Sequence, residues 1–212
     1  MKIEGLILAG GKSRRMGGIH KGNMELGKNT FTEIIWEELK KDCGNINVSY
    51  GDVVHDTHKD WGIVKDIYPD CGPIGGLQAG LRACRGDTVF VAACDMPFLQ
   101  IEFYRYLAQY MEGADAVVPV VNGRLHPLSA VYKSSAHKVF EAQIQKKNYK
   151  IICSLEKMRV MYLNLKSDKF AWMMQNINTM EEYQEAKKLF GKRSNICREL
   201  RLTRQEISCL KK

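Results

Sequence analysis

A short run of glycines and cations near the start of the chain has the composition of a phosphate-binding loop. The apolar residues 5–9 predict a buried strand, and Gly10-Gly11 predicts a sharp turn directly after it. The backbone N–H groups of such a turn can approach an anion closely. Glycine amides combined with Lys and Arg side chains are typical of nucleoside triphosphate sites. Here the cations are Lys12, Arg14, Arg15 and Lys21.

Two familiar phosphate motifs do not match this loop. A P-loop requires a glycine five positions before the glycine of Gly-Lys-Ser, where this chain has Leu6. The dinucleotide pattern Gly-x-Gly-x-x-Gly fails as well, because Gly11 and Lys12 follow Gly10 directly. The structural alternative is an ordinary glycine turn with solvated cations, and the density of positive charge makes it the less favoured interpretation.

A carboxylate follows a second apolar run. Residues 87–93 contain the stretch Thr-Val-Phe-Val-Ala-Ala, which is typical of a central parallel strand, and Asp95 comes just after it. Open α/β sheets bind ligands at the carboxyl ends of their strands, and carboxylate oxygens suit Mg²⁺ bound to phosphates. Asp95 is therefore the predicted metal ligand. The alternative is an Asp that caps a helix beginning near Pro97.

These two segments resemble a known family. The string Leu8-Ala-Gly-Gly-Lys-Ser-Arg-Arg-Met-Gly17 with Lys21, and Cys-Asp-Met-Pro-Phe at residues 94–98, are similar to motifs of sugar-nucleotidyltransferase-like enzymes. Within that superfamily they look most like the molybdenum cofactor guanylyltransferases, the MobA family. The resemblance covers roughly residues 1–190. One position departs from it, because His20 stands where these enzymes usually have aspartate.

The resemblance implies roles for individual residues. Asp66, which precedes Gly-Pro-Ile-Gly-Gly at residues 72–76, would contact the base or ribose, although an Asp that caps a turn is the alternative. On the acceptor side the resemblance implies Arg124, His126 and Asn178, with a solvated arginine and a local capping asparagine as alternatives. The nucleotide site would be formed by Leu8, Ala9, Gly10, Gly11, Lys21, Asp66 and Asp95.

The implied reaction transfers GMP from GTP to molybdopterin. A phosphate oxygen of molybdopterin attacks the α-phosphorus in line, and pyrophosphate leaves. Arg15, Lys21 and Asp95 with Mg²⁺ are the expected catalytic groups, helped by the glycine amides. Alternatives are CMP transfer to the same cofactor and nucleotide transfer to a sugar or polyol phosphate. A non-catalytic nucleotide or cofactor carrier, which hands the cofactor to molybdoenzymes, is the alternative from another class.

The elements that must position these residues alternate along the chain. Alternation with motifs at strand ends predicts a doubly wound, mostly parallel α/β sheet, which the resemblance identifies as nucleotide-diphospho-sugar-transferase-like. Asn122-Gly123 predicts a tight turn, and Thr179 with Glu182 has capping-box spacing. The predicted strands are 5–9, 46–50, 61–64, 87–93, 114–121 and 159–165, and the predicted helices are 30–41, one from Pro73, 98–111, 134–147, 150–158 and one from Asn176.

Charge and composition favour an enzyme for small anions. The 212 residues suit one domain, expected over residues 1–190, followed by a basic tail at 191–212. Residues 192–212 hold seven Lys or Arg against two Glu, which is +5 of the formal net charge of +8. The body is thus only weakly basic, so a broad nucleic-acid face is not expected. Without a secretory leader or long apolar run, a cytoplasmic, membrane-free location is expected.

Cysteine and histidine patterns argue against other sites. Seven cysteines without a Cys-x-x-Cys pair predict reduced, partly buried thiols rather than disulfides or structural zinc. Cys94 is not expected to be a nucleophile, because no paired histidine is evident. His55 and His58 form an H-x-x-H pair without a third nearby ligand, so solvated surface is favoured over a metal site.

Overall fold

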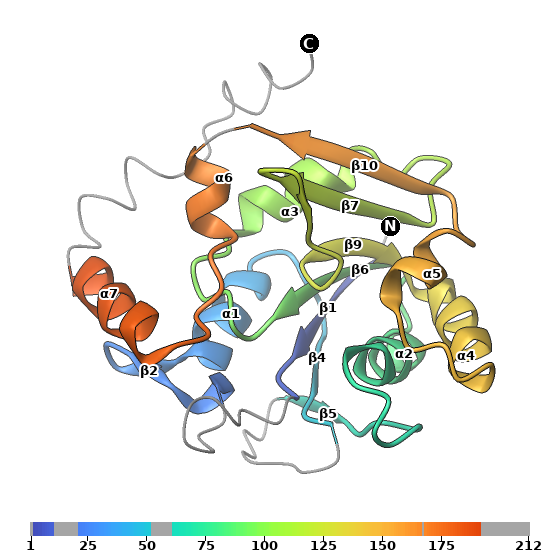
Figure 1. Ribbon diagram of the computed structural model, residues 1–212, viewed down its shortest axis with the longest axis horizontal. Helices are drawn as coiled ribbons and strands as arrows, with labels where there is room; N and C mark the ends of the chain where they lie inside the picture. Colours follow the sequence, from blue (N-terminus) through green and yellow to red (C-terminus); the bar gives the residue numbers. More distant parts are fainter. Residues whose placement is uncertain (1, 11–20, 52–60, 167, 192–212) are drawn as a thin grey trace.

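A central sheet organises the computed structural model, which describes residues 2–10, 21–51, 61–166 and 168–191 (Figure 1). Within these residues the sheet has eight strands in the order β10-β7-β9-β6-β1-β4-β5, with β8 paired to β7. Only the pairings of β8 and β9 are antiparallel, so the predicted mostly parallel α/β fold is confirmed. The strands are β1 (Ile3–Leu8), β4 (Ile46–Ser49), β5 (Gly62–Val64), β6 (Thr88–Ala93), β7 (Ala116–Val121), β8 (Arg124–Leu125), β9 (Ala130–Lys133) and β10 (Val160–Leu165).

Helices cover both faces of the sheet (Figure 1). One face carries α1 (Phe31–Leu39), α3 (Ile101–Ala108) and α6 (Asp168–Met173). The other carries α2 (Pro73–Ala83), α4 (His137–Gln145) and α5 (Ile151–Leu155). Successive side chains of a strand point to opposite faces, and β1 shows the result: Ile7 packs into the first layer, and Leu6 and Leu8 pack into the second.

A smaller hydrophobic cluster joins the two ends of the described chain. The early end contributes the 3-10 helix η2 (Lys21–Asn23) and the hairpin of β2 (Glu25–Leu26) and β3 (Asn29–Thr30), and the late end contributes α7 (Met180–Gly191), which lies beside β2 (Figure 1). The Tyr183 hydroxyl donates to the Glu25 carbonyl at 2.8 Å. The hairpin of β2 and β3 was not predicted from the sequence, whereas the helices on either side of the cluster were. The buried members are Met24, Leu26, Phe31, Ile34, Phe98, Ile177, Tyr183 and Ala186.

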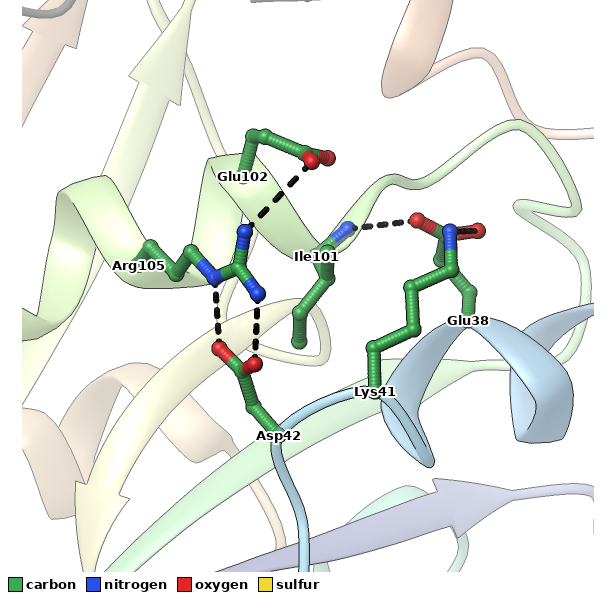
Figure 2. A network of polar contacts seen from close by, with 6 residues as sticks. All are labelled: Glu38, Lys41, Asp42, Ile101, Glu102 and Arg105. Atoms are coloured by element: carbon green, nitrogen blue, oxygen red, sulfur yellow. Dashed lines mark hydrogen bonds and ion pairs between the residues drawn. The ribbon is translucent and has the colours of Figure 1, made fainter. Parts of the chain in front are cut away.

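The ends of α1 and α3 show what local sequence does and does not determine. Helix α1 was predicted to start at Thr30 or Thr32, and Thr30 is its cap. Thr30 Oγ1 accepts from the Glu33 N–H at 3.2 Å, and the Glu33 carboxylate accepts from the Thr30 N–H at 2.6 Å. The predicted start of α3 at Phe98 is wrong by three residues. Helix α3 begins at Ile101, whose N–H donates to Glu38 of α1 at 2.9 Å (Figure 2). A partner 63 residues away therefore sets this helix start.

The same network ties the end of α1 to α3. The Arg105 guanidinium donates two hydrogen bonds of 2.6 Å to the Asp42 carboxylate, and Lys41 pairs with Glu38 at 2.6 Å (Figure 2). Bidentate geometry makes the arginine pair the more specific of the two contacts.

Other predicted elements are confirmed with changed limits. The helix predicted at 134–147 is the 3-10 helix η3 (Ser134–Ala136) followed by α4, and the one predicted at 150–158 is α5. Asn122 and Gly123 both have positive φ, as a tight hairpin turn requires. Helix α6 was not predicted. No helix in the described part of the chain has the length and apolarity to cross a membrane.

Gly80 lets α2 lie directly on β1. A Cβ at Gly80 would lie 2.9 Å from Leu6 Cγ and closer still to both Leu6 methyl carbons. From the sequence, a glycine in the first turns of this helix would let a ligand or another backbone approach closely. The structure shows that it admits the side chain of Leu6.

Candidate active site

The carboxyl ends of four adjacent parallel strands meet at one edge of the sheet. In the order β6-β1-β4-β5, they lead into Asp95, Gly10, Tyr50 and Asp66. The Cys94 N–H donates to the Leu8 carbonyl at 3.0 Å, which joins the first two of these ends. The predicted phosphate-loop glycine and both predicted carboxylates therefore share one edge, where open α/β sheets bind ligands.

Gly10 marks a close backbone crossing. A Cβ at this position would lie 2.9 Å from the Gly51 nitrogen, so a side chain would displace backbone. The N–H groups of Ala9 and Gly10 both donate to the Ser49 carbonyl, at 2.8 and 3.0 Å. The Gly10 amide is thus already engaged, and amide donors to a phosphate would come from later residues of the loop. Gly11, Lys12, Arg14, Arg15 and His20 lie outside the described residues, as do His55, His58 and the tail at 192–212.

Asp66 lies over the first turn of α2. The Ser49 hydroxyl donates to Asp66 Oδ1 at 3.2 Å, and a Cβ at Gly75 would lie 3.0 Å from Asp66 Oδ2. Gly76 leaves similar room, because its Cβ would lie 3.0 Å from Ser49 Oγ. The glycine-rich start of α2 thus makes space for this carboxylate. A negative charge here is favoured by the dipole at the helix N-terminus.

Lys21 and Asp95 face each other beneath the segment before α7. Lys21 Nζ lies 3.7 Å from Asp95 Oδ2 and donates to Asn178 Oδ1. The Asn176 side chain donates to Asp95 Oδ2 at 3.5 Å, and the Ile177 N–H donates to the Asp95 carbonyl at 2.8 Å. Burial raises the pKa of the Asp95 carboxyl, and the Lys21 ammonium opposes that shift.

The predicted acceptor residues Arg124 and His126 come from the hairpin of β7 and β8 and the loop after it. Arg124 is exposed on β8, and His126 follows it, with an N–H that donates to the Pro119 carbonyl at 3.0 Å. The loop then returns to the Asp95 turn, where the Ser129 hydroxyl donates to Met96 Sδ at 3.1 Å. Burial lowers the pKa of His126, and Arg124 lowers it further, so the imidazole is neutral at pH 7. Arg124 pairs with Val121 at the carboxyl end of β7, and the acceptor roles of Arg124 and His126 stay predictions.

Residues 5–158 match the family model of the MobA-like NTP transferase domain. The chain belongs to this family. It is 33% identical over 191 residues to a Clostridium perfringens protein named "Probable molybdenum cofactor guanylyltransferase", covering 87% of this chain and 96% of that protein. It is 30% identical over 194 residues to the molybdenum cofactor guanylyltransferase of Desulfosudis oleivorans, covering 87% and 94%. The protein is therefore an enzyme, a nucleotidyltransferase, and the predicted family is confirmed.

Solved structures agree on the fold of this transferase. Molybdopterin-guanine dinucleotide biosynthesis protein A from Archaeoglobus fulgidus has a TM-score of 0.73 and 26% identity, and the match covers 91% of this chain and all of that one. The 2-C-methyl-D-erythritol 4-phosphate cytidylyltransferase of Thermus thermophilus has a TM-score of 0.66 at 13% identity, covering 89% and 98%. The second match shows the nucleotidyltransferase fold alone, and both confirm the predicted fold class.

The chemistry at Asp95 fits a divalent cation in the transferase. Asp95 Oδ1 is buried and has no hydrogen-bond partner among the described residues. No group of three His, Cys, Asp or Glu residues in that part of the chain could hold a metal without help. One protein carboxylate completed by phosphate oxygens and water is the usual arrangement for Mg²⁺ with nucleotides. The alternative role, as a helix cap near Pro97, is wrong, because α3 begins only at Ile101.

Cys94 is a buried thiol, and its surroundings support the prediction that it is not a nucleophile. Burial raises the pKa of its thiol to about 12, and the charge of Asp95 contributes to the shift. The described cysteines at 43, 71, 84, 94 and 153 are all free. A protonated thiol is a poor nucleophile, so a covalent cysteine intermediate is not expected.

Sequence reasoning missed two parts of the site. The contact between Lys21 and Asn178 joins residues 157 positions apart, and local patterns do not reveal such pairs. Ser49 was overlooked as a partner of Asp66. A usable signal existed for Ser49, because a polar residue at the carboxyl end of a predicted parallel strand lies at the ligand-binding edge of the sheet.

Proposed function

We propose that this chain transfers GMP from GTP to the phosphate of molybdopterin and releases pyrophosphate. The observation that carries the proposal is its similarity to relatives named molybdenum cofactor guanylyltransferase over 94–96% of their length. The arrangement of Lys21 and Asp95 at the strand ends supports the reaction class. The cytidylyltransferase match, at 13% identity, gives no comparable support for a cytidine substrate.

The proposed reaction is a direct displacement. A phosphate oxygen of molybdopterin forms a bond to the α-phosphorus of GTP, and the bond from that phosphorus to the oxygen bridging the β-phosphorus breaks. The leaving pyrophosphate takes the electron pair. Lys21, together with Arg15 of the loop, stabilises the charge that develops there. Mg²⁺, held by Asp95 and phosphate oxygens, supplies Lewis-acid neutralisation of the same charge when bound.

Asp66 and the acceptor residues complete the assignment. Asp66, held by Ser49 above the start of α2, contacts the base or ribose of GTP. The backbone of Leu8, Ala9, Gly10 and Gly11 lies next to the phosphates. Because the Ala9 and Gly10 N–H groups already donate to the Ser49 carbonyl, the amide donors to the phosphates come from Gly11 onward. Arg124, His126 and Asn178 face the acceptor.

A pyrophosphate-release assay with each of the four nucleoside triphosphates, with and without molybdopterin, tests the proposal. Release is expected with GTP only when molybdopterin is present. Asp95→Asn should abolish release, whereas the matched surface variant Asp115→Asn should retain it. Release with CTP would indicate cytidylyl transfer, binding without release would indicate a carrier, and an equal response to all four nucleotides would refute the guanylyltransferase assignment.

A further inference from the structure

The N-terminus of α7 carries one hydrogen bond more than a capping box requires. The box itself is present, because the Glu182 N–H donates to Thr179 Oγ1 at 3.2 Å and the Thr179 N–H donates to Glu182 Oε2 at 3.0 Å. The same Glu182 oxygen also accepts from the Asn178 N–H, at 2.6 Å. This shorter bond involves Asn178, the residue before the cap residue Thr179, and Asn178 is also the residue that contacts Lys21.

Asn178 is thereby fixed from both sides. On its N-terminal side, Ile177 is fully buried in the cluster that joins the two ends of the described chain, and its N–H donates to the Asp95 carbonyl. On its C-terminal side, the Glu182 carboxylate holds two successive N–H groups. A short segment anchored at both ends has little freedom to rotate, so the direction of the Asn178 side chain is set by its backbone.

The side-chain oxygen Oδ1 of Asn178 in turn determines where the Lys21 ammonium lies. Charge-assisted bonds between an ammonium and a carboxylate are normally about 2.7–2.9 Å long. Lys21 Nζ stays 3.7 Å from Asp95 Oδ2 and donates to Asn178 instead. A lysine stem is flexible, so without Asn178 the ammonium is expected to move onto Asp95 and to compete there with a metal ion.

We propose that Glu182 is a positioning residue for Lys21, acting through Asn178. Its carboxylate orients the peptide that carries Asn178, and Asn178 holds the ammonium beside Asp95 without letting it pair tightly there. The importance of this for turnover rests on the proposed function, which assigns Lys21 to the phosphates of GTP. The positioning itself is a property of the folded chain and is measurable without substrate.

Three variants separate positioning from helix stability. Glu182→Ala removes the acceptor oxygen and should lower kcat about tenfold, the scale expected for a lost hydrogen bond to a charged group, with little change in KM for the nucleotide. Glu182→Gln keeps a carbonyl acceptor and should restore most of the activity. Thr179→Ala removes the other half of the capping box. It should lower Tm about as much as Glu182→Ala does, but should leave kcat within about twofold of wild type.

A double-mutant cycle tests whether Glu182 acts through Asn178. If it does, Glu182→Ala in an Asn178→Ala background should reduce kcat little further. The Asn178→Ala change has already removed the contact with Lys21 that Glu182 would position. Losses that multiply would overturn the proposal. So would an equal loss of kcat in Thr179→Ala and Glu182→Ala, because helix stability would then explain both.

Chemical labelling of Lys21 in the ligand-free full chain tests the positioning directly. Acetylation by acetic anhydride, measured at Lys21 by mass spectrometry, should be several-fold slower in Glu182→Ala than in wild type, Glu182→Gln or Thr179→Ala, because an ammonium paired tightly with Asp95 is shielded from the reagent. Unchanged labelling in Glu182→Ala would overturn the inference. If wild type shows no turnover with any nucleotide, the guanylyltransferase proposal fails, whereas this measurement still decides the role of Glu182.

Discussion

Burial raises the pKa of the Asp95 carboxyl, and the Lys21 ammonium beside it opposes the shift only in part. One carboxylate oxygen is shared between Lys21 and Asn176, and the other is buried and has no hydrogen-bond partner among the described residues. An ionised group in such surroundings disfavours the folded state of the ligand-free chain. A cation and the phosphates that accompany it would compensate this cost, so the unfavourable environment is itself evidence of a binding role.

Replacing Asp95 by Asn should stabilise the ligand-free protein while it abolishes turnover. The folded pKa of Asp95 lies above the unfolded value of 3.8, so its contribution to stability is present below 3.8 and is lost as the pH rises through the folded pKa. Asn carries no such penalty. Urea unfolding at pH 7 should therefore give Asp95→Asn a higher free energy of unfolding than wild type, with the difference shrinking toward pH 4.

Asp115 is the matched control because its pKa moves the other way. The Arg159 side chain and N–H lower the pKa of Asp115, so this carboxylate stabilises the fold at neutral pH and loses that effect as the pH falls. Asp115→Asn should thus lower the free energy of unfolding at pH 7. If both variants change stability in the same direction, the assigned environment of Asp95 is incorrect.

The individual residues whose position could be predicted from the sequence are those next to a strand end. Gly10 and Asp95 each lie two residues beyond the end of a buried strand. The apolar run predicted the strand, and the fold class predicted the edge. The contact of Lys21 depends on Asn178, which lies just before α7 and far away in the sequence. Only tertiary packing brings Asn178 there, and no local pattern encodes it.

Packing of α2 on β1 depends on a missing side chain at Gly80. In a helix interior, Gly→Ala normally gains about 1 kcal/mol of stability through backbone entropy. Here the new methyl group would overlap the fully buried side chain of Leu6, and overpacking of a core costs about 1–3 kcal/mol. Steric overlap therefore exceeds the gain, and Gly80→Ala should lower the free energy of unfolding and Tm.

Gly44 provides the comparison for this substitution. A Cβ there would have no heavy atom within 4 Å, and the residue is not among those with positive φ. Gly44→Ala should be neutral or slightly stabilising, by up to about 1 kcal/mol. Thermal unfolding of both variants measures the difference, and an unchanged Tm in Gly80→Ala would show that α2 adjusts to the added methyl group.

The elements themselves were predictable where one periodicity dominated. The buried strands β1 and β6 and the capped helix α1 follow directly from their sequences. The start of α3 was not predictable, because Glu38 supplies its cap from another helix. Strand β9 has only four residues and lies between the longer strands β7 and β6. Its antiparallel pairing depends on these neighbours rather than on its own sequence.

Over the whole molecule, the proposed nucleotide and acceptor sides lie on different parts of one sheet. Strands β1, β4 and β5 lead to the glycine loop and Asp66, whereas β7 and β8 lead to Arg124 and His126. Asp95, at the end of β6, lies between them. Residues 176–178, just before α7, contact Lys21 and Asp95 at this junction, and α7 itself contacts the first hairpin through Tyr183. The site is thus complete only when the whole sheet and α7 are assembled.

Nucleotide binding should therefore stabilise the entire fold, and it should do so selectively. A ligand at 100 times its Kd adds about 2.7 kcal/mol, which for a protein of this size raises Tm by about 5–10 °C. With Mg²⁺ present, GTP is expected to give such a shift and CTP a much smaller one.

Asp66→Asn should reduce the GTP shift, because it removes the carboxylate assigned to the nucleoside. Asp87→Asn, at the amino end of β6 and the opposite edge of the sheet, should leave it unchanged. Equal shifts with all four nucleotides, or a full GTP shift in Asp66→Asn, would contradict the assignment of Asp66.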